Sequence, residues 1–405
     1  MNINGLIMAD LHWGAIDPDE FADEISKLLY PYIEKLDVID GIRLDYIIIA
    51  GDLFDTKETF SSQVTKQIII FLAKLLFLTR YWETEIILIE GTRTHDNLQL
   101  DTLKVIFDSC DVYRLKVIDT VTAYNIGDAT MLFIPEEYVS DQDAYYEKYF
   151  IGDAFYDIIV GHGMIDKIWY SKKPTNGLDE LTKHMSAPVF KVKELLNHCS
   201  MCYFGHIHQN KSYGDKGRFK YIGPFTRWEF GNDTKVGFYH VTIDTDTHEV
   251  SDKYIENELA KWYPTHAFTI DKDITLTELN DKIDTIIAKY YVKHYNIGRL
   301  RLIINLSDKV ETWQTIKSFL IDKLGNRLDV KTVLNIMPDI DGSTDETEST
   351  SSSMPNYVFD HTIDIAHRIQ QFIQSKSGRD IPIETIEQYL EGDDDNGNDQ
   401  FESDE

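Results

Sequence analysis

Two histidines separated by one residue, His206 and His208, follow an apolar run that ends at Phe204. An apolar run that stops at Gly205 is typical of a buried strand that ends at a site, since glycine permits the chain to turn there. Neutral imidazole is a common ligand of divalent transition metals. The pair therefore indicates a metal site, although a single His-x-His is more often a surface or core pair.

Other apolar runs of the sequence end in candidate ligands in the same way. The residues that follow these runs are Asp10 and His12, Asp52, His95 and Asp96, and His162. Because sites in α/β sheets form beyond the carboxyl ends of the strands, we expect these side chains to converge. Carboxylates mixed with imidazoles suit Mn²⁺, Fe²⁺ or Zn²⁺. The pattern predicts two divalent cations that share one carboxylate.

Two such cations would polarise a phosphoryl group and lower the pKa of a bound water. Phosphodiester hydrolysis is the reaction that needs both effects. His95, near the metals but not bound to them, would protonate the leaving oxygen, and the neighbouring Asp96 would orient it or raise its pKa. The alternative is that His95 is a hydrogen-bonded structural histidine.

The elements that must position these ligands read as alternating strands and helices. Apolar runs predict strands at 3–8, 46–50, 85–89, 157–160 and 201–204, and helical spacing predicts helices near 21–36 and 61–81. This alternation indicates an α/β sheet covered on both faces. We expect the runs at 219–224 and 236–243 to close a second sheet.

The rest of the chain divides into smaller parts. We expect a main domain at 1–255, a small α/β domain at 256–337 built as a βαβαβ unit, a polar disordered linker at 338–356, a helical segment at 357–391 and an acidic tail at 392–405. The helical segment carries an apolar stripe at three- and four-residue spacing, formed by Phe359, Ile363, Ala366, Ile369 and Ile373. It docks either on its own domain or on a partner.

Composition limits the class of protein. The net charge of −29 argues against a large basic groove, so cations would supply much of the positive charge that faces a phosphate. The three cysteines make no disulfide framework, and Cys199 and Cys202 are expected to be buried thiols. No apolar run is long enough to span a membrane and no secretory signal is visible, so we expect a cytoplasmic protein.

Taken together, these motifs resemble the calcineurin-like metallophosphoesterases. The motifs are Asp10-x-His12, Gly51-Asp52, the 91–96 loop, Gly161-His162-Gly163 and Gly205-His206-x-His208. The segments at 51–55 and 221–225 are more narrowly similar to the SbcD-type nucleases, the DNA double-strand-break repair subunits that work with an SMC-like ATPase. The resemblance covers residues 1–245.

The resemblance implies a two-sheet sandwich flanked by helices, with a small α/β capping domain and a C-terminal helical segment that grips the ATPase. It implies Asp10, His12, Asp52 and His208 around one cation, Asp52, His162 and His206 around another, and His95 as the transition-state histidine. Two Mn²⁺ ions and 3′–5′ exonuclease and endonuclease activity on DNA follow from it. The family's asparagine ligand is missing from the 91–96 loop, where Thr94, Asn97 or a water molecule would replace it.

The expected partners are DNA and an SbcC-type ATPase subunit, since this chain has no glycine-rich ATP-binding motif. Homodimerisation is compatible with the sequence, and the altered loop is shared by some virus-encoded relatives, which would act in the cytoplasm of a bacterial host. Two other functions are compatible with the ligands. One is a dimetal phosphatase or phosphodiesterase with a non-DNA substrate, and the other is a catalytically impaired scaffold.

Overall fold

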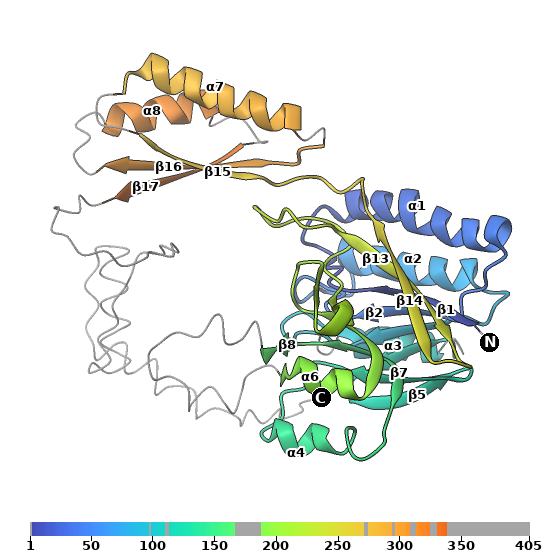
Figure 1. Ribbon diagram of the computed structural model, residues 1–405. Helices are drawn as coiled ribbons and strands as arrows, with labels where there is room; N and C mark the ends of the chain where they lie inside the picture. The colour runs from blue at the N-terminus through green and yellow to red at the C-terminus, as the bar shows by residue number, and fades with distance from the viewer. Residues whose placement is uncertain are drawn as a thin grey trace, which may run out of the picture. The chain divides into compact units, whose positions relative to one another are not determined.

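The computed structural model describes residues 2–96, 99–109, 113–166, 188–270, 274–293, 296–307, 313–324 and 330–337. They form a mixed α/β structure with two six-stranded sheets in the main body (Figure 1). The first sheet has the order β14 (Glu249–Glu256), β13 (Gly237–Asp244), β1 (Asn2–Met8), β2 (Tyr46–Ala50), β3 (Glu85–Ile89) and β4 (Leu115–Ile118). The second has the order β11 (Lys211–Tyr213), β12 (Phe219–Tyr221), β10 (Cys199–Gly205), β7 (Tyr156–His162), β6 (Ala129–Ile134) and β5 (Thr122–Ile126).

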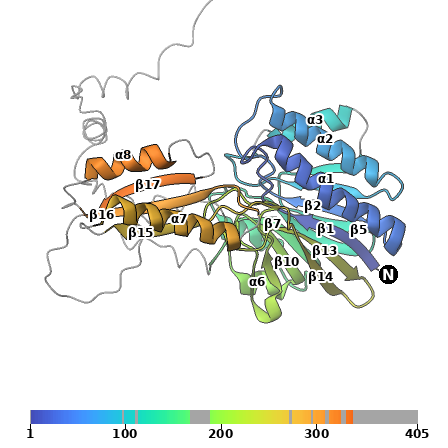
Figure 2. The same cartoon turned by 90° about the horizontal axis from the view of Figure 1, so that it is seen from above.

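Helices cover the outer face of each sheet. The first sheet carries α1 (Pro18–Lys35), which continues into a π-helical turn at Leu36–Asp40, α2 (Gln63–Leu78) and α3 (Gln99–Ser109). Figure 2 shows these three helices next to one another. The second sheet carries the short helices α4 (Gln142–Glu147) and α6 (Val192–Asn197), with a two-stranded pair of β8 (Met164–Ile165) and β9 (Val189–Phe190) nearby.

Three apolar clusters hold these layers together. Alternate residues of β2 point to opposite faces, so Ile47 and Ile49 pack under the helices while Ile48 packs between the two sheets. Phe133 on β6 and Tyr203 on β10 fill the same space between the sheets from the other side. Because both faces of the central strands are buried, their sequences are continuous apolar runs and not alternating ones.

Local signals fix the starts of the longer helices. The Asp17 carboxylate accepts the backbone N–H groups of Asp19 and Glu20 at the start of α1, with Pro18 in the first turn. The Ser62 hydroxyl accepts the N–H of Thr65 at the start of α2. Both caps satisfy donors that have no partner within the helix.

One predicted pairing is wrong. The strand expected at 236–243 does not close the second sheet, because β13 pairs antiparallel with β1 in the first, with Asn2 opposite Asp244. Only β12, from the run at 219–224, joins the second sheet, where it pairs parallel with β10. An apolar run predicts a strand but does not specify which neighbour it pairs with.

The residues after β14 build a third, smaller sheet. Its strands β15 (Thr265–Ile270), β16 (Leu300–Ser307) and β17 (Val330–Met337) are parallel and in chain order. Helices α7 (Leu276–Lys293) and α8 (Trp313–Leu324) connect them and pack on one face (Figure 1). The predicted βαβαβ unit is therefore confirmed.

The parts expected at 338–356, 357–391 and 392–405 lie outside the described residues. Among the described helices, none combines the length and the apolar content that crossing a bilayer requires.

Candidate metal centre

The segments that follow β1 and β2 run side by side and carry the first group of candidate ligands. The backbone N–H of Asp10 donates to the carbonyl of Gly51 at 3.1 Å, and that of His12 donates to the carbonyl of Asp52 at 3.0 Å. The pairing continues the parallel register of the two strands, in which Met8 lies opposite Ile49. It brings Asp10 and His12 beside Asp52.

The first cluster consists of Asp10, His12, Asp52 and His208, whose ligand atoms lie within 4.8 Å of one another. His12 Nε2 lies 3.1 Å from His208 Nε2 and 3.6 Å from Asp52 Oδ2. Three strand ends, those of β1, β2 and β10, contribute to this cluster. The predicted convergence of these four residues is therefore present in the structure.

The second cluster consists of Glu136, His162 and His206. His206 Nδ1 lies 2.9 Å from Glu136 Oε2, and His162 Nε2 lies 3.6 Å from the same oxygen. The ring of His162 is fixed from behind, because its Nδ1 donates to the carbonyl of Ala50 at 2.9 Å. That bond leaves Nε2 as the nitrogen that faces the cluster.

Asp52 lies between the two clusters. Its Oδ2 is 3.6 Å from His12 Nε2 in the first and 3.2 Å from His162 Nε2 in the second. The other oxygen, Oδ1, accepts the backbone N–H of Thr92 at 2.6 Å, which fixes the carboxylate plane. A single carboxylate oxygen is thus within reach of ligands on both sides.

The backbone of this centre adopts a conformation that glycine favours and other residues rarely adopt. Asp10, His12, Asp52 and His206 all have positive φ angles, of 49°, 42°, 52° and 87°. Non-glycine residues in this region cost about 1–3 kcal/mol each and concentrate at functional sites. Gly51 also has a positive φ, and a Cβ there would overlap the ring of His162, so this position admits no other residue.

The donor set fits divalent cations. Asp10 Oδ1 accepts the backbone N–H of His206 at 2.8 Å, but Oδ2 is buried and has no hydrogen-bond partner. Asp52 and Asp10 are 2% and 0% exposed, and buried carboxylates require a cationic partner to offset their lost hydration. Carboxylate and imidazole groups are suitable ligands for a divalent cation, which would be that partner.

The charged groups of the centre shift the pKa values of Asp52 and His162. Burial alone would raise the pKa of Asp52, but the adjacent imidazoles, that of His162 first, hold it far below its usual range. Burial alone would lower the pKa of His162, yet the carboxylates of Asp52, Asp10 and Glu136 hold it well above its ordinary value. The carboxylates around His162 therefore favour its protonated form when no cation is present.

His95 lies at the edge of the first cluster. Its ring is perpendicular to that of His12, with 4.7 Å between the centroids, and its Nδ1 donates to the carbonyl of Asp55. His12, Asp55 and His95 also form a third group of potential ligands. The bond to Asp55 leaves Nε2 of His95 available for proton transfer.

The Asp96 carboxylate has other hydrogen-bond partners than the one expected. Its carboxylate does not orient His95, because Oδ1 accepts the backbone N–H groups of Leu53 and Phe54 and Oδ2 accepts that of Gly91. Burial and the charge of Asp52 raise the pKa of Asp96 to about 7. Asp96 therefore ties the loops after β2 and β3 together, and the carbonyl of Asp55 holds His95.

The expectation for Thr94 also needs correction. Its side chain is exposed, whereas that of Thr92 points into the centre, with Oγ1 at 3.2 Å from Asp52 Oδ2 and 3.4 Å from Glu136 Oε2. Asn97 lies outside the described residues.

Sequence reasoning missed Glu136, Trp228 and Glu229. Glu136 follows β6, an apolar run that ends in Pro-Glu-Glu, so it carries the same strand-end signal as the predicted ligands. The ring of Trp228 lies 4.7 Å from that of His12 and 5.1 Å from that of His208. Glu229 Oε1 is 3.0 Å from His208 Nδ1, which leaves Nε2 of His208 facing the cluster.

Two basic residues that follow the His206–His208 motif in the sequence, Arg218 and Lys220, have partners within the protein. Arg218 donates to the carbonyls of Cys199 and Leu196, and Lys220 is paired with Asp252 at 2.6 Å. The expectation for the thiols is confirmed, since Cys199 and Cys202 are buried and form no disulfide.

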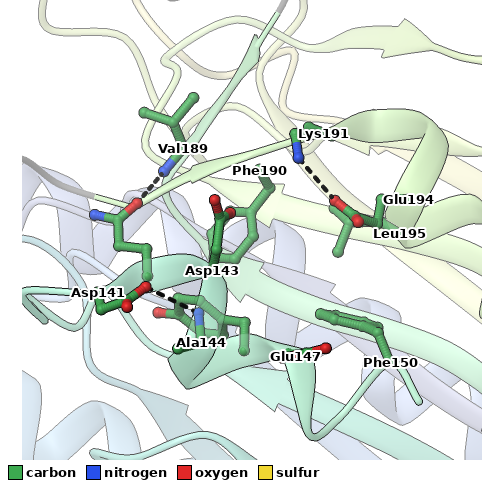
Figure 3. A pocket seen from close by; sticks show the side chains of 12 residues that line it. Asp141, Asp143, Ala144, Glu147, Phe150, Val189, Phe190, Lys191, Glu194 and Leu195 are labelled. Atoms are coloured by element: carbon green, nitrogen blue, oxygen red, sulfur yellow. Dashed lines mark hydrogen bonds and ion pairs between the residues drawn. The ribbon is translucent and has the colours of Figure 1, made fainter.

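A pocket of about 620 Å³ lies elsewhere, between α4 and the β9–α6 segment (Figure 3). Its rim carries Asp141, Asp143, Glu147 and Glu194, and Lys191 lies 3.6 Å from Glu194. None of the described residues that line it belongs to the two metal clusters. The chemistry of the centre is therefore separate from this pocket.

No protein-family model and no curated protein matches this chain. The solved structures that resemble it include the crystal structure of TT1561 of Thermus thermophilus, with 11% sequence identity and a TM-score of 0.33, covering 63% of this chain and 99% of that one. A second solved structure has 11% identity and a TM-score of 0.34 over the same shares. Likeness at this level carries no argument about fold or activity.

Proposed function

We propose that the chain is a metal-dependent DNA nuclease with the calcineurin-like metallophosphoesterase architecture. The observation that carries the proposal is the position of Asp52 Oδ2, 3.6 Å from His12 Nε2 and 3.2 Å from His162 Nε2. A carboxylate between two sets of imidazole and carboxylate donors is the arrangement that a pair of divalent cations requires.

In this proposal Asp10, His12, Asp52 and His208 hold one cation, and Asp52, His162 and His206 hold the other. When bound, the two ions supply Lewis-acid polarisation of the phosphoryl group and a water of lowered pKa, and Mn²⁺ is the ion we favour. The residues of the chain keep these donors oriented and largely shielded from bulk water.

His95 is the proton donor of the reaction. The carbonyl of Asp55 holds its Nδ1, so the protonated ring presents Nε2–H toward the leaving oxygen of the scissile phosphodiester. After the transfer, the ring is neutral and still bonded to Asp55, which preserves its orientation. Trp228 closes the side of the cluster next to His12 and His208.

The partner of the nuclease is an SMC-like ATPase of the SbcC type. This chain carries no glycine-rich ATP-binding motif, so ATP-driven action on DNA requires a second polypeptide. The apolar stripe at 359–373, outside the described residues, is the segment we expect to bind it. Deletion of 357–405 then weakens ATPase binding in a pull-down and spares basal DNA cleavage, whereas unchanged binding refutes this docking role.

The deciding experiment is a cleavage assay on linear duplex and single-stranded DNA with Mn²⁺, using wild type, Asp52→Asn and His95→Ala. We expect cleavage by the wild type and strong loss in both variants. Absence of DNA cleavage, with and without the ATPase partner, would refute the nuclease assignment. Cleavage of small phosphodiesters alone would move the assignment to a non-DNA substrate, and absence of bound metal would leave only a scaffold.

A further inference from the structure

Glu136 follows β6. Among the described residues, it is the carboxylate that the second cluster contains in addition to its two histidines. We propose that Glu136 is a direct ligand of the second cation through Oε2, and that it replaces the neutral donor missing from the 91–96 loop. This inference rests on the proposed two-cation centre. It assigns a ligand that the sequence motifs do not contain.

The two carboxylate oxygens of Glu136 have different neighbours. Oε2 lies 2.9 Å from His206 Nδ1 and 3.6 Å from His162 Nε2, so it faces the ring nitrogens that the second cation would use. Oε1 points the other way and accepts the hydroxyl of Tyr138 at 2.6 Å. The hydrogen bond from Tyr138 therefore holds Oε1 away from the cluster and leaves Oε2 as the oxygen that faces the two imidazoles.

The backbone of Glu136 is also held in place. Its N–H donates to the carbonyl of Glu90 at 3.1 Å, which joins the end of β6 in the second sheet to the end of β3 in the first. The side chain is fully buried. An acidic side chain enclosed in this way, beside two imidazoles, is difficult to explain by packing alone.

The threonines of the 91–96 loop are poorer candidates for the same position. Thr94 is exposed, and Thr92 Oγ1 already contacts Asp52 Oδ2 at 3.2 Å. A neutral hydroxyl is also a weak donor for a divalent cation compared with a carboxylate. Thr92 instead lies between Asp52 and Glu136, where it spaces the two carboxylates.

A carboxylate at this position changes the charge of the centre. Asp10, Asp52 and Glu136 together offset three of the four positive charges of two divalent cations, one more than a centre with a neutral donor would offset. Oxygen donors from carboxylates suit Mn²⁺ and Mg²⁺, whereas imidazole alone favours Zn²⁺. Tyr138 acts as a positioning residue, and the guanidinium of Arg93 lies over its ring at 4.7 Å.

The test is a titration with Mn²⁺ alone, in which electron paramagnetic resonance counts the free and bound ion. The variants are Glu136→Gln, Tyr138→Phe and the matched control Glu137→Gln, whose carboxylate bonds to Val121 and Tyr145 away from the centre. We expect two bound ions in the wild type and the control. Glu136→Gln weakens one of the two sites at least tenfold, and Tyr138→Phe weakens the same site by about tenfold, the range for an outer hydrogen-bond partner of a metal ligand.

The possible results distinguish this inference from the function on which it rests. Two ions bound to Glu136→Gln with wild-type affinity would overturn the role of Glu136 and leave the two-cation centre intact. No Mn²⁺ bound to the wild type would overturn both. If Glu136→Gln does not fold by circular dichroism, Glu136→Asp withdraws the carboxylate by one methylene, and we expect the same selective weakening of one site.

Discussion

His12 Nε2 and His208 Nε2 lie 3.1 Å apart, although 196 residues separate them in the chain. Glu229 fixes the other nitrogen of His208, and Asp55 Oδ1 lies 3.3 Å from the other nitrogen of His12. Both rings thus present Nε2 to one point, beside the buried and unpartnered Oδ2 of Asp10. Opposed imidazole nitrogens next to an unpartnered carboxylate oxygen are the strongest sign that the first cluster holds a cation.

Removal of one of these nitrogens should remove one ion. We expect His208→Ala to bind one Mn²⁺ in place of two and to cleave DNA at least about 100-fold more slowly, since cation-assisted charge stabilisation is worth several kcal/mol. Equilibrium dialysis with elemental analysis measures the stoichiometry. The control is His248→Ala, an exposed histidine outside the clusters, and two ions retained by His208→Ala would contradict the ligand assignment.

His95 should affect the rate without affecting the metal. A positioned general acid contributes about 10²–10⁴-fold, so we expect His95→Ala to lose activity in that range while it binds two Mn²⁺ ions with unchanged affinity. Steady-state cleavage of duplex DNA measures the loss of activity, and the Mn²⁺ titration measures the affinity and number of bound ions. Loss of a bound ion in this variant would contradict this role. It would mean that His95 binds a cation together with His12 and Asp55.

Asp96 should affect stability more than chemistry. Asp96→Ala leaves the backbone N–H groups of Leu53, Phe54 and Gly91 without their acceptor, and each unsatisfied buried donor costs about 1–3 kcal/mol. We therefore expect the free energy of unfolding in urea to fall by roughly 3 kcal/mol or more. Asp96→Asn keeps one acceptor oxygen and should lose less. A variant with wild-type stability and no activity would restore the catalytic role expected from the sequence.

Metal binding should depend on pH through the histidines. Burial alone would lower the pKa of His208, but Glu229, Asp10 and Asp52 raise it, and the pKa of His162 is raised as well. A raised imidazole pKa means that the metal-free centre holds protons near neutral pH, and cations bind only the neutral ring. Mn²⁺ affinity should therefore increase as pH rises toward these pKa values, with release of protons.

Calorimetry in two buffers with different ionisation enthalpies measures that release. We expect the heat of Mn²⁺ binding at neutral pH to differ between the buffers and the difference to shrink at higher pH. Identical heats in both buffers would show that the imidazoles are already neutral, in disagreement with the electrostatics of the metal-free centre.

The sequence predicted most of this centre because its ligands follow strand ends. Asp10, Asp52, His162 and His206 each come after a continuous apolar run, and parallel strands bring their carboxyl ends to one edge. Glu136 obeys the same rule at the end of β6, but a glutamate after a proline does not stand out from solvated loop acids. Its role becomes visible only when the second sheet places it beside His206.

Sequence adjacency misled the interpretation of two residues. Asp96 is next to His95 in the chain, yet its carboxylate does not contact that ring: Oδ1 accepts a backbone N–H from the loop after β2 and Oδ2 accepts that of Gly91 in its own loop. Thr94 is next to His95 on the other side, yet its side chain is exposed and that of Thr92 contacts Asp52. The pairing of β13 with β1 was likewise not predictable, since it depends on contacts more than two hundred residues apart.

The central claim is that Asp52 joins two cations, and electron paramagnetic resonance of the protein loaded with two Mn²⁺ ions tests it most directly. Two ions bridged by one carboxylate are close enough to couple magnetically, so we expect the spectrum of a coupled pair from the wild type and its loss in Asp52→Asn. A fully loaded wild type that gives only the spectrum of isolated, uncoupled ions would contradict the account.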